Sequence, residues 1–221
     1  MPEIFDWGFA LEILPTLAEA AIVTIEATLL GFVLAVVLGL LLAILRMAKN
    51  PLISWPVTGF IEFIRSTPLL VQLFFMFFVL PEFGIRMSPL VTGILTLGVH
   101  YSTYCSEVYR AGLENVPKGQ WEASIALNLS PYVTFRDIII PQAIPPVVPA
   151  LGNYLVAMFK ETPQLAGIAV AELMLTASEI GSENFRYIEP ITIVGLFFLV
   201  LSLISAAGIR HVERWLQHRR G

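Results

Sequence analysis

The chain has 221 residues, of which 57% are hydrophobic and only 14% are charged, and its mean hydropathy is +0.78. A soluble domain of this size carries about 25% charged residues. The composition therefore excludes a soluble globular protein and indicates an integral membrane protein. Cys105 is the only cysteine, which excludes an intrachain disulfide and a cysteine-based metal site. The three histidines lack metal-ligand spacing, so we expect no metal site.

Five apolar stretches predict an all-α membrane protein that forms a single domain over residues 1–221. A helix needs about 20 residues to cross the hydrocarbon core of a bilayer. The fourth stretch is irregular, because prolines precede it and Lys160-Glu161-Thr162-Pro163 interrupts it. Broken helices of this kind build transport sites in membrane transporters. The expected spans cover residues 17–45, 57–80, 89–110, 145–162 and 190–210.

Basic residues predict the orientation of these five spans, because cytoplasmic loops carry an excess of lysine and arginine. With the N-terminus outside, three basic residues fall on the outer side: Arg86, Lys160 and Arg186. We therefore expect an external N-terminus and a cytoplasmic C-terminus. Nine basic residues fall on the cytoplasmic side: Arg46, Lys49, Arg110, Lys118, Arg136, Arg210, Arg214, Arg219 and Arg220.

The third span is unusually polar for a helix in lipid, with residues 100–104 reading His-Tyr-Ser-Thr-Tyr. Such a helix is expected to face other helices or a water-filled path. Hydrogen bonding within the bundle and lining of a path explain these side chains equally well. Two pairs spaced three apart, Glu62 with Arg65 and Glu107 with Arg110, are expected to form structural ion pairs. The candidate substrate path comprises Gln72, Tyr101, Tyr104, Lys160 and Glu161.

A polar loop of about residues 111–144 joins the third and fourth spans and is expected in the cytoplasm. It reads as two short helices, because Asn128 tolerates a left-handed turn and Ser130-Pro131 is typical of a helix start. We expect the second helix to end near Ile139, where Pro141 follows. Such a helix pair is either an ordinary solvated surface or a docking element for a cytoplasmic partner.

This loop resembles the signature loop of bacterial ABC-importer permeases. That pattern is Glu-Ala-Ala, three residues, Gly, nine residues and then Ile-x-Leu-Pro. The chain has Glu122-Ala123-Ser124, three residues, Asn128, nine residues and Ile138-Ile139-Ile140-Pro141. The spacing matches throughout, and each departure keeps the size or the conformational tolerance of the residue that it replaces.

Three further stretches resemble the polar amino-acid branch of this family: EFIRSTPLLVQLFF, EVYRAGLENVPKGQWEAS and FKETPQLAGIAVAEL. The resemblance covers nearly the whole chain. It implies a five-span permease in the bacterial inner membrane that pairs with a copy of itself or a sister permease. It also implies two partner ATPase subunits and an extracytoplasmic solute-binding protein. The sequence contains no GxxxxGK[ST] motif, so we expect ATP and Mg²⁺ on the partner ATPase and no cofactor on this chain.

In the family the signature loop inserts a short coupling helix into the ATPase, so ATP-driven closure would rock the spans between two access states. The resemblance implies that Glu122 makes a charged contact and that Trp121 or Leu127 supplies an apolar anchor. The chain is then a transport subunit, not an enzyme, and nothing in it implies a nucleic-acid partner. The expected coupling residues are Trp121, Glu122, Ala123, Ser124, Leu127, Asn128, Ile138 and Pro141.

The family suggests a polar amino acid as substrate, and a compatible solute such as ectoine or hydroxyectoine is an alternative. Two other classes fit less well. An ion-coupled secondary transporter would need more spans or an internal repeat, and Glu26 is its sole isolated acidic candidate. A small membrane enzyme would need a nucleophile–base pair or a metal-ligand cluster, and the sequence shows neither.

Overall fold

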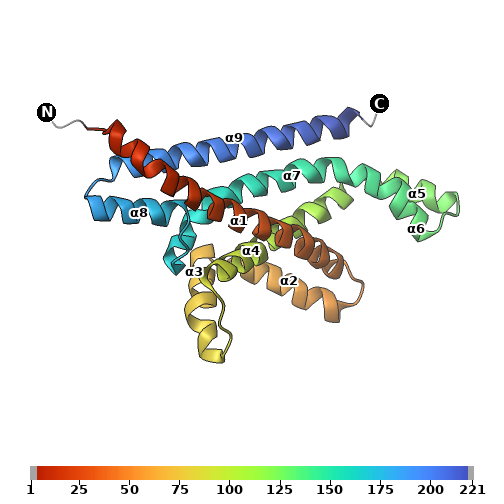
Figure 1. The fold of residues 1–221 in the computed structure, drawn as a ribbon. Coiled ribbons are helices and arrows are strands. Elements are labelled where there is room, and N and C mark those ends of the chain that lie inside the picture. Colours follow the sequence, from red (N-terminus) through yellow and green to blue (C-terminus); the bar gives the residue numbers. More distant parts are fainter. Residues whose placement is uncertain (1–3, 219–221) are drawn as a thin grey trace.

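The computed structural model describes residues 4–218, and these residues form helices without any strand. The long helices α1 (Trp7–Arg46), α7 (Ile140–Glu161) and α9 (Ile188–His218) run lengthwise through the bundle (Figure 1). The start of α1 and the end of α9 lie at opposite ends of the bundle, and a pair of short helices projects beyond the end of α9 (Figure 1). The remaining elements are α2 (Pro51–Arg65), α3 (Leu69–Phe74), α4 (Pro89–Glu114), α5 (Lys118–Ala126), α6 (Pro131–Val133) and α8 (Leu173–Asn184).

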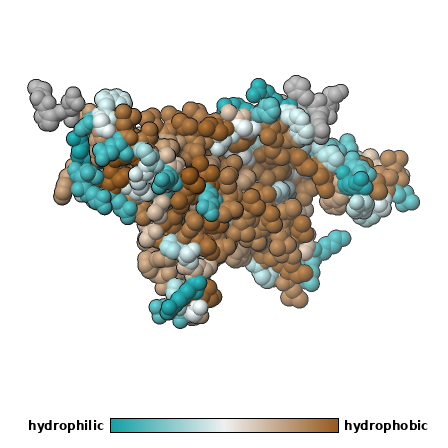
Figure 2. Space-filling model, viewed as in Figure 1, coloured by the Kyte–Doolittle hydropathy of each residue, from teal (hydrophilic) through white to brown (hydrophobic). Residues whose placement is uncertain are grey.

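The surface pattern suits a membrane protein. Apolar residues cover the middle of the molecule, while hydrophilic residues gather mainly at its two ends (Figure 2). Three helical stretches are long and apolar enough to cross a membrane, namely 7–46, 131–168 and 188–216, and a bent pair of helices raises the number to four. The helix α4 is not among them, because the polar residues in its second half lower its hydropathy.

The helices α1 and α4 approach each other closely along their length. A Cβ atom on Gly39 would lie 2.6 Å from Cys105 Cβ and 2.8 Å from the Ser102 carbonyl oxygen. A Cβ atom on Gly98 of α4 would lie 2.5 Å from a methyl carbon of Leu34. Small residues allow membrane helices to pack this tightly, where van der Waals contact replaces the hydrophobic driving force.

The region of the predicted second span, residues 57–80, is strongly bent. The helix α2 ends at Arg65, and α3 with its continuation to Phe83 leaves at an angle of 104°. Pro68 is the cause, because it disfavours helical backbone at Thr67 and itself adopts an extended conformation (φ −63°, ψ 139°). Beyond α3 the chain continues as the π-helix η1 (Phe75–Val79) and the 3₁₀-helix η2 (Leu80–Phe83).

The expected stop at Pro141 and the expected helix start at 145 are wrong. After α6 the chain forms the π-helix η3 (Thr134–Ile139), and α7 follows without a gap. The wider π turn places Pro141 in the first turn of α7, where a missing N–H group is tolerated. Helical structure therefore occupies much of the predicted loop 111–144, from Pro131 onward and, on the other side, up to Glu114.

The chain beyond α7 changes direction twice. The 3₁₀-helix η4 (Thr162–Ile168) ends at Ala169, which adopts a left-handed conformation (φ 59°). The helix α8 then starts at Leu173, and the fully buried Glu172 caps it by accepting a hydrogen bond from Leu175 N (2.8 Å). Phe185, also left-handed (φ 54°), ends α8 before α9 begins.

The tight α1–α4 contact predicts that Gly39→Val lowers the free energy of unfolding by about 1–3 kcal/mol, since overpacking displaces the neighbouring helix. The matched control is Gly195→Val on α9, because a Cβ atom at Gly195 meets no atom within 4 Å. Thermal unfolding of the purified protein in nanodiscs is the measurement. Equal melting temperatures for the two variants would contradict the proposed role of Gly39.

Candidate coupling loop and transport cavity

The loop between α4 and α7 contains the turn that the sequence predicts. Asn128 adopts the left-handed conformation (φ 49°), and Leu129 N donates to the Ser124 carbonyl oxygen (3.0 Å). Ser130 caps α6 by accepting a hydrogen bond from Val133 N (3.4 Å). The helix α5 and the segment α6–η3 are thereby folded against each other as a helical hairpin, which projects from the bundle (Figure 1).

Some of the expected coupling residues hold this hairpin together. Ser124 is buried and donates to the Gln120 carbonyl oxygen (2.7 Å). The Trp121 ring packs edge-on against Phe135 with 5.2 Å between ring centroids, and it covers a small core that contains Ile139. Ile138 packs at the edge of the same core. Trp121 therefore points inward, which does not fit its expected role as an anchor on a partner.

The outward face of the hairpin is apolar at three positions. Ile125 is 78% exposed, Leu127 is 71% exposed and Tyr132 is 69% exposed, and we call these three residues the loop patch. Glu122, Ala123 and Pro141 are exposed as well. Only Leu127 of the loop patch was expected from the sequence. Ile125 was not among the expected coupling residues, although it lies one helical turn after Trp121.

A second feature is a cavity of about 430 Å³ at the break between α2 and α3, against α4 and the end of α7. Of the five expected path residues, Tyr104 and Glu161 line it. Lys160 is exposed and is not among the residues that line this cavity. The cavity lining comprises Arg65, Ser66, Thr67, Pro68, Leu69, Leu70, His100, Tyr104, Glu161 and Gln164.

Aromatic rings form one wall of the cavity. Tyr104 packs against His100, Tyr101 and Tyr154, with 5.3–6.0 Å between ring centroids. The Arg65 guanidinium lies 5.2 Å from the centre of the Tyr104 ring, within the range of a cation–π contact. Tyr154 was not among the expected path residues, because it lies 50 residues from Tyr104 and meets that ring only through the packing of α7 on α4.

Glu161 brings a carboxylate to the same place. Its carboxylate interacts with the Tyr101 hydroxyl, and its Oε2 atom is buried without a hydrogen-bond partner among the described residues. A buried carboxylate oxygen without a donor costs free energy. This oxygen is therefore suited to accept a hydrogen bond from a cationic group in the cavity.

Gln72 does not line the cavity but forms hydrogen bonds across the break between α2 and α3. Its Nε2 atom donates to Ile64 O (2.7 Å), Thr67 O (3.1 Å) and Thr67 Oγ1 (2.7 Å). Its Oε1 atom lies 3.0 Å from His100 Nδ1. Backbone carbonyls within a membrane need such partners, so Gln72 satisfies the groups that the break leaves open and ties them to α4.

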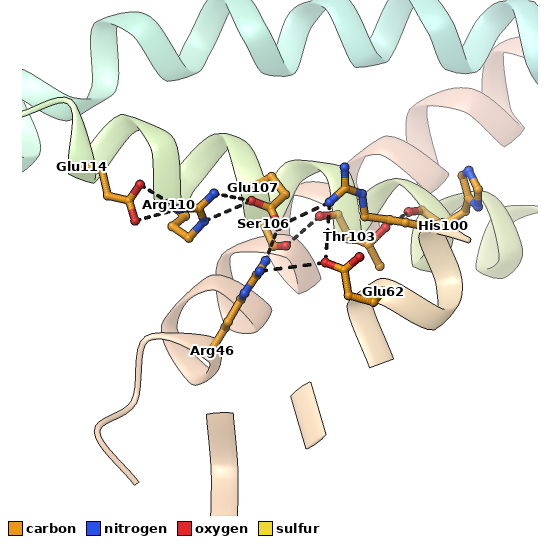
Figure 3. Close-up of polar contacts among 9 residues, drawn as sticks. Arg46, Glu62, His100, Thr103, Ser106, Glu107, Arg110 and Glu114 are labelled. Atoms are coloured by element: carbon orange, nitrogen blue, oxygen red, sulfur yellow. Dashed lines mark hydrogen bonds and ion pairs between the residues drawn. The ribbon is translucent and has the colours of Figure 1, made fainter. Parts of the chain in front are cut away.

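A cluster of ion pairs lies next to the cavity and joins α1, α2 and α4. We call these residues the Glu107 cluster. Glu107 accepts hydrogen bonds from Arg46 of α1 and from Arg110 of its own helix (Figure 3). It also accepts one from Arg65 of α2. The expected pairs Glu62–Arg65 and Glu107–Arg110 are confirmed, at 4.0 and 2.8 Å. The cluster comprises Arg46, Glu62, Arg65, Glu107, Arg110 and Glu114, and its formal charges cancel.

Residues 35–218 match the family described as binding-protein-dependent transport system inner membrane component. The probable amino-acid ABC transporter permease protein y4tG of Sinorhizobium fredii is 46% identical over 94% of this chain and 90% of that protein. The glutamine transport system permease protein GlnP of Escherichia coli is 34% identical over 95% of this chain and 97% of its own length. The L-cystine transport system permease protein TcyB of Bacillus subtilis is 34% identical over 91% of this chain and 88% of its own.

Solved structures of ABC transporters resemble this chain as well. A chain of an amino acid ABC transporter with histidines is 33% identical and superposes with a TM-score of 0.90, over 95% of this chain and 98% of that chain. A chain of the MetNI methionine ABC transporter, at 19% identity and a TM-score of 0.73, shares the fold. The resemblance seen in the sequence is thus confirmed. The chain belongs to the family of binding-protein-dependent transport system inner membrane components, and the relatives named here are amino-acid ABC transporter permeases.

Proposed function

We propose that this chain is the membrane-spanning permease subunit of an ATP-driven importer, and that it carries a polar amino acid into the cytoplasm. The cavity carries the proposal, because it places an arginine, a carboxylate and an aromatic wall together inside a member of a permease family. These groups match the two charges of an amino acid, and no further chemistry is required for transport.

Five crossings follow for the chain: α1, the bent pair α2–α3 with its continuation, α4, α7 with η4, and α9. The 26 residues of α4 span about 39 Å at 1.5 Å per residue, which is sufficient for a bilayer. Its polar side chains need not meet lipid, because the residues from His100 to Thr103 are buried in the bundle. The excess of basic residues then places the helical hairpin and the C-terminus in the bacterial cytoplasm and the N-terminus outside.

The helical hairpin is the contact for a dimer of ATPase subunits, which bind ATP and Mg²⁺. Three exposed apolar side chains at the tip of a projecting element suit a protein interface, and Glu122 beside them suits a charged contact. Trp121 contributes by bracing the hairpin from inside, so that motion of the partner moves η3 and α7 with it. A second permease subunit, either a copy or a sister chain, and an extracytoplasmic solute-binding protein complete the importer.

The substrate is a zwitterion whose carboxylate pairs with Arg65 and whose ammonium group pairs with Glu161. A guanidinium presents a planar fork of donors that matches a carboxylate. The Oε2 atom of Glu161 lacks a donor among the described residues and accepts a hydrogen bond from the ammonium group. Tyr104 also lines the cavity, where it can contact the rest of the amino acid. Glutamine, histidine and cystine are the amino acids that the relatives named above suggest as first tests.

We predict that Leu127→Ala weakens assembly with the ATPase about five- to tenfold, because truncating an apolar anchor at an interface costs about 1 kcal/mol or more. The control is Leu196→Ala on α9, a leucine that is 55% exposed on the side of the bundle. Co-purification of the ATPase and the hydrolysis rate of the complex are the measurements. The docking role of the hairpin is refuted if Leu127→Ala assembles and hydrolyses ATP as well as Leu196→Ala does.

We predict that Glu161→Gln weakens substrate binding to the assembled complex about 10- to 100-fold, because a hydrogen bond to a charged group contributes about 1.5–3 kcal/mol. The control is Lys160→Gln, which alters the adjacent exposed charge and should leave binding unchanged. Calorimetric titration with L-glutamine, L-histidine and L-cystine is the measurement. Equal affinities for wild type and Glu161→Gln would show that the substrate does not use this carboxylate.

A further inference from the structure

Arg65 belongs to the cavity and to the Glu107 cluster at once. It is the last residue of α2, directly before the break, and its guanidinium lines the cavity above the Tyr104 ring. From the same position Arg65 Nη1 lies 3.4 Å from Glu107 Oε1. Tyr104 and Glu107 are three residues apart on α4 and so lie on one face of that helix. A single side chain thus joins the cavity to the ion pairs beside it.

Arg65 is also the arginine of the Glu107 cluster that is held least tightly. Its ion-pair distances are 3.4 Å to Glu107 and 4.0 Å to Glu62. Arg110, by comparison, reaches both Glu114 oxygens at 2.7 Å and Glu107 Oε2 at 2.8 Å. Arg46 also donates a hydrogen bond to Glu107 (Figure 3). If Arg65 leaves Glu107, that carboxylate therefore keeps two other arginine partners.

We propose that Glu107 and the carboxylate of the transported amino acid compete for Arg65, so that filling the cavity loosens the ion pair between α2 and α4. This inference rests on the proposed function, because it requires an amino acid in the cavity. A substrate carboxylate that binds Arg65 in a bidentate manner replaces the 3.4 Å contact between Arg65 and Glu107 with two short hydrogen bonds. The end of α2 then loses one of its contacts with α4, while the Gln72–His100 contact remains.

The competition has a consequence in the reverse direction. Coupling between two binding events is reciprocal, so removing the Glu107–Arg65 ion pair must strengthen binding of the carboxylate. The two side chains are 34% and 20% exposed and the contact is long, so its contribution is close to that of a surface ion pair. Glu107→Gln should therefore bind the amino acid about two- to fivefold more tightly than wild type. Arg65→Ala should bind it more weakly.

The experiment is calorimetric titration of the assembled complex in nanodiscs with L-glutamine, L-histidine and L-cystine. Each amino acid is compared with its methyl ester, which lacks the carboxylate charge. We expect Glu107→Gln to gain affinity for the amino acids and not for the esters. Glu114→Gln is the matched control, because Glu114 pairs with Arg110 on its own helix and should leave affinity unchanged.

If Glu107→Gln does not assemble, Glu107→Asp serves instead, because the shorter side chain keeps its charge but withdraws from Arg65; the same gain is expected. Weaker or unchanged binding by the Glu107 variants overturns the competition, and so does an equal gain for the esters. Failure of the proposed function looks different: wild type would bind none of the three amino acids, or Arg65→Ala and Glu161→Gln would bind them as wild type does.

Discussion

The structure depends on how a polar helix is kept away from lipid. The helix α4 carries buried threonine and serine hydroxyls that donate to carbonyls one turn earlier in the same helix, as Thr96 and Ser106 do. The helix α1 covers the backbone of α4, and at Gly39 the two helices are so close that no side chain fits between them. Because these groups are satisfied inside the bundle, α4 can present His100, Tyr104 and Glu107 to its neighbours without facing hydrocarbon.

The cavity and the Glu107 cluster both depend on this position of α4. The break at Pro68 opens a space beside the polar face, and Gln72 satisfies the carbonyls that the break exposes. One helical turn farther along α4, Glu107 gathers arginines from α1 and α2. Arg65 lies between the cavity and the Glu107 cluster, so the cavity and the contacts between α2 and α4 share one side chain. The helical hairpin is a separate element, braced from inside by Trp121 and Phe135.

Local signals in the sequence predicted the local structure well. Asn128, Ser130 and Pro131 specify a turn and a helix start through their own backbone preferences, and the structure has both. The helix end expected at Pro141 was wrong. A proline ring clashes with the preceding turn of a regular α-helix, and the wider turn of the π-helix η3 avoids that clash. Trp121 was expected to be an outward anchor. Residue spacing alone does not show which face of the short helix α5 packs against the rest of the loop.

Contacts between segments that are distant in the chain could not be predicted from the sequence. The pair Glu107–Arg110 could be predicted from its spacing, but Arg46 lies 61 residues from Glu107 and Arg65 lies 42 residues from it. Their meeting depends on the α1–α4 packing and on the bend after α2. The same holds for Arg65 with Tyr104, and for Glu161 beside Tyr101. Residue types suggested a polar path, and only the fold shows which of those residues meet there.

Uptake into proteoliposomes tests the central claim most directly. The chain would be reconstituted with its ATPase and solute-binding protein, and accumulation of radiolabelled L-glutamine, L-histidine and L-cystine would be followed. The account predicts accumulation of at least one amino acid only when hydrolysable ATP is present on the side that bears the helical hairpin. Accumulation without ATP, driven by a proton or sodium gradient, would contradict it.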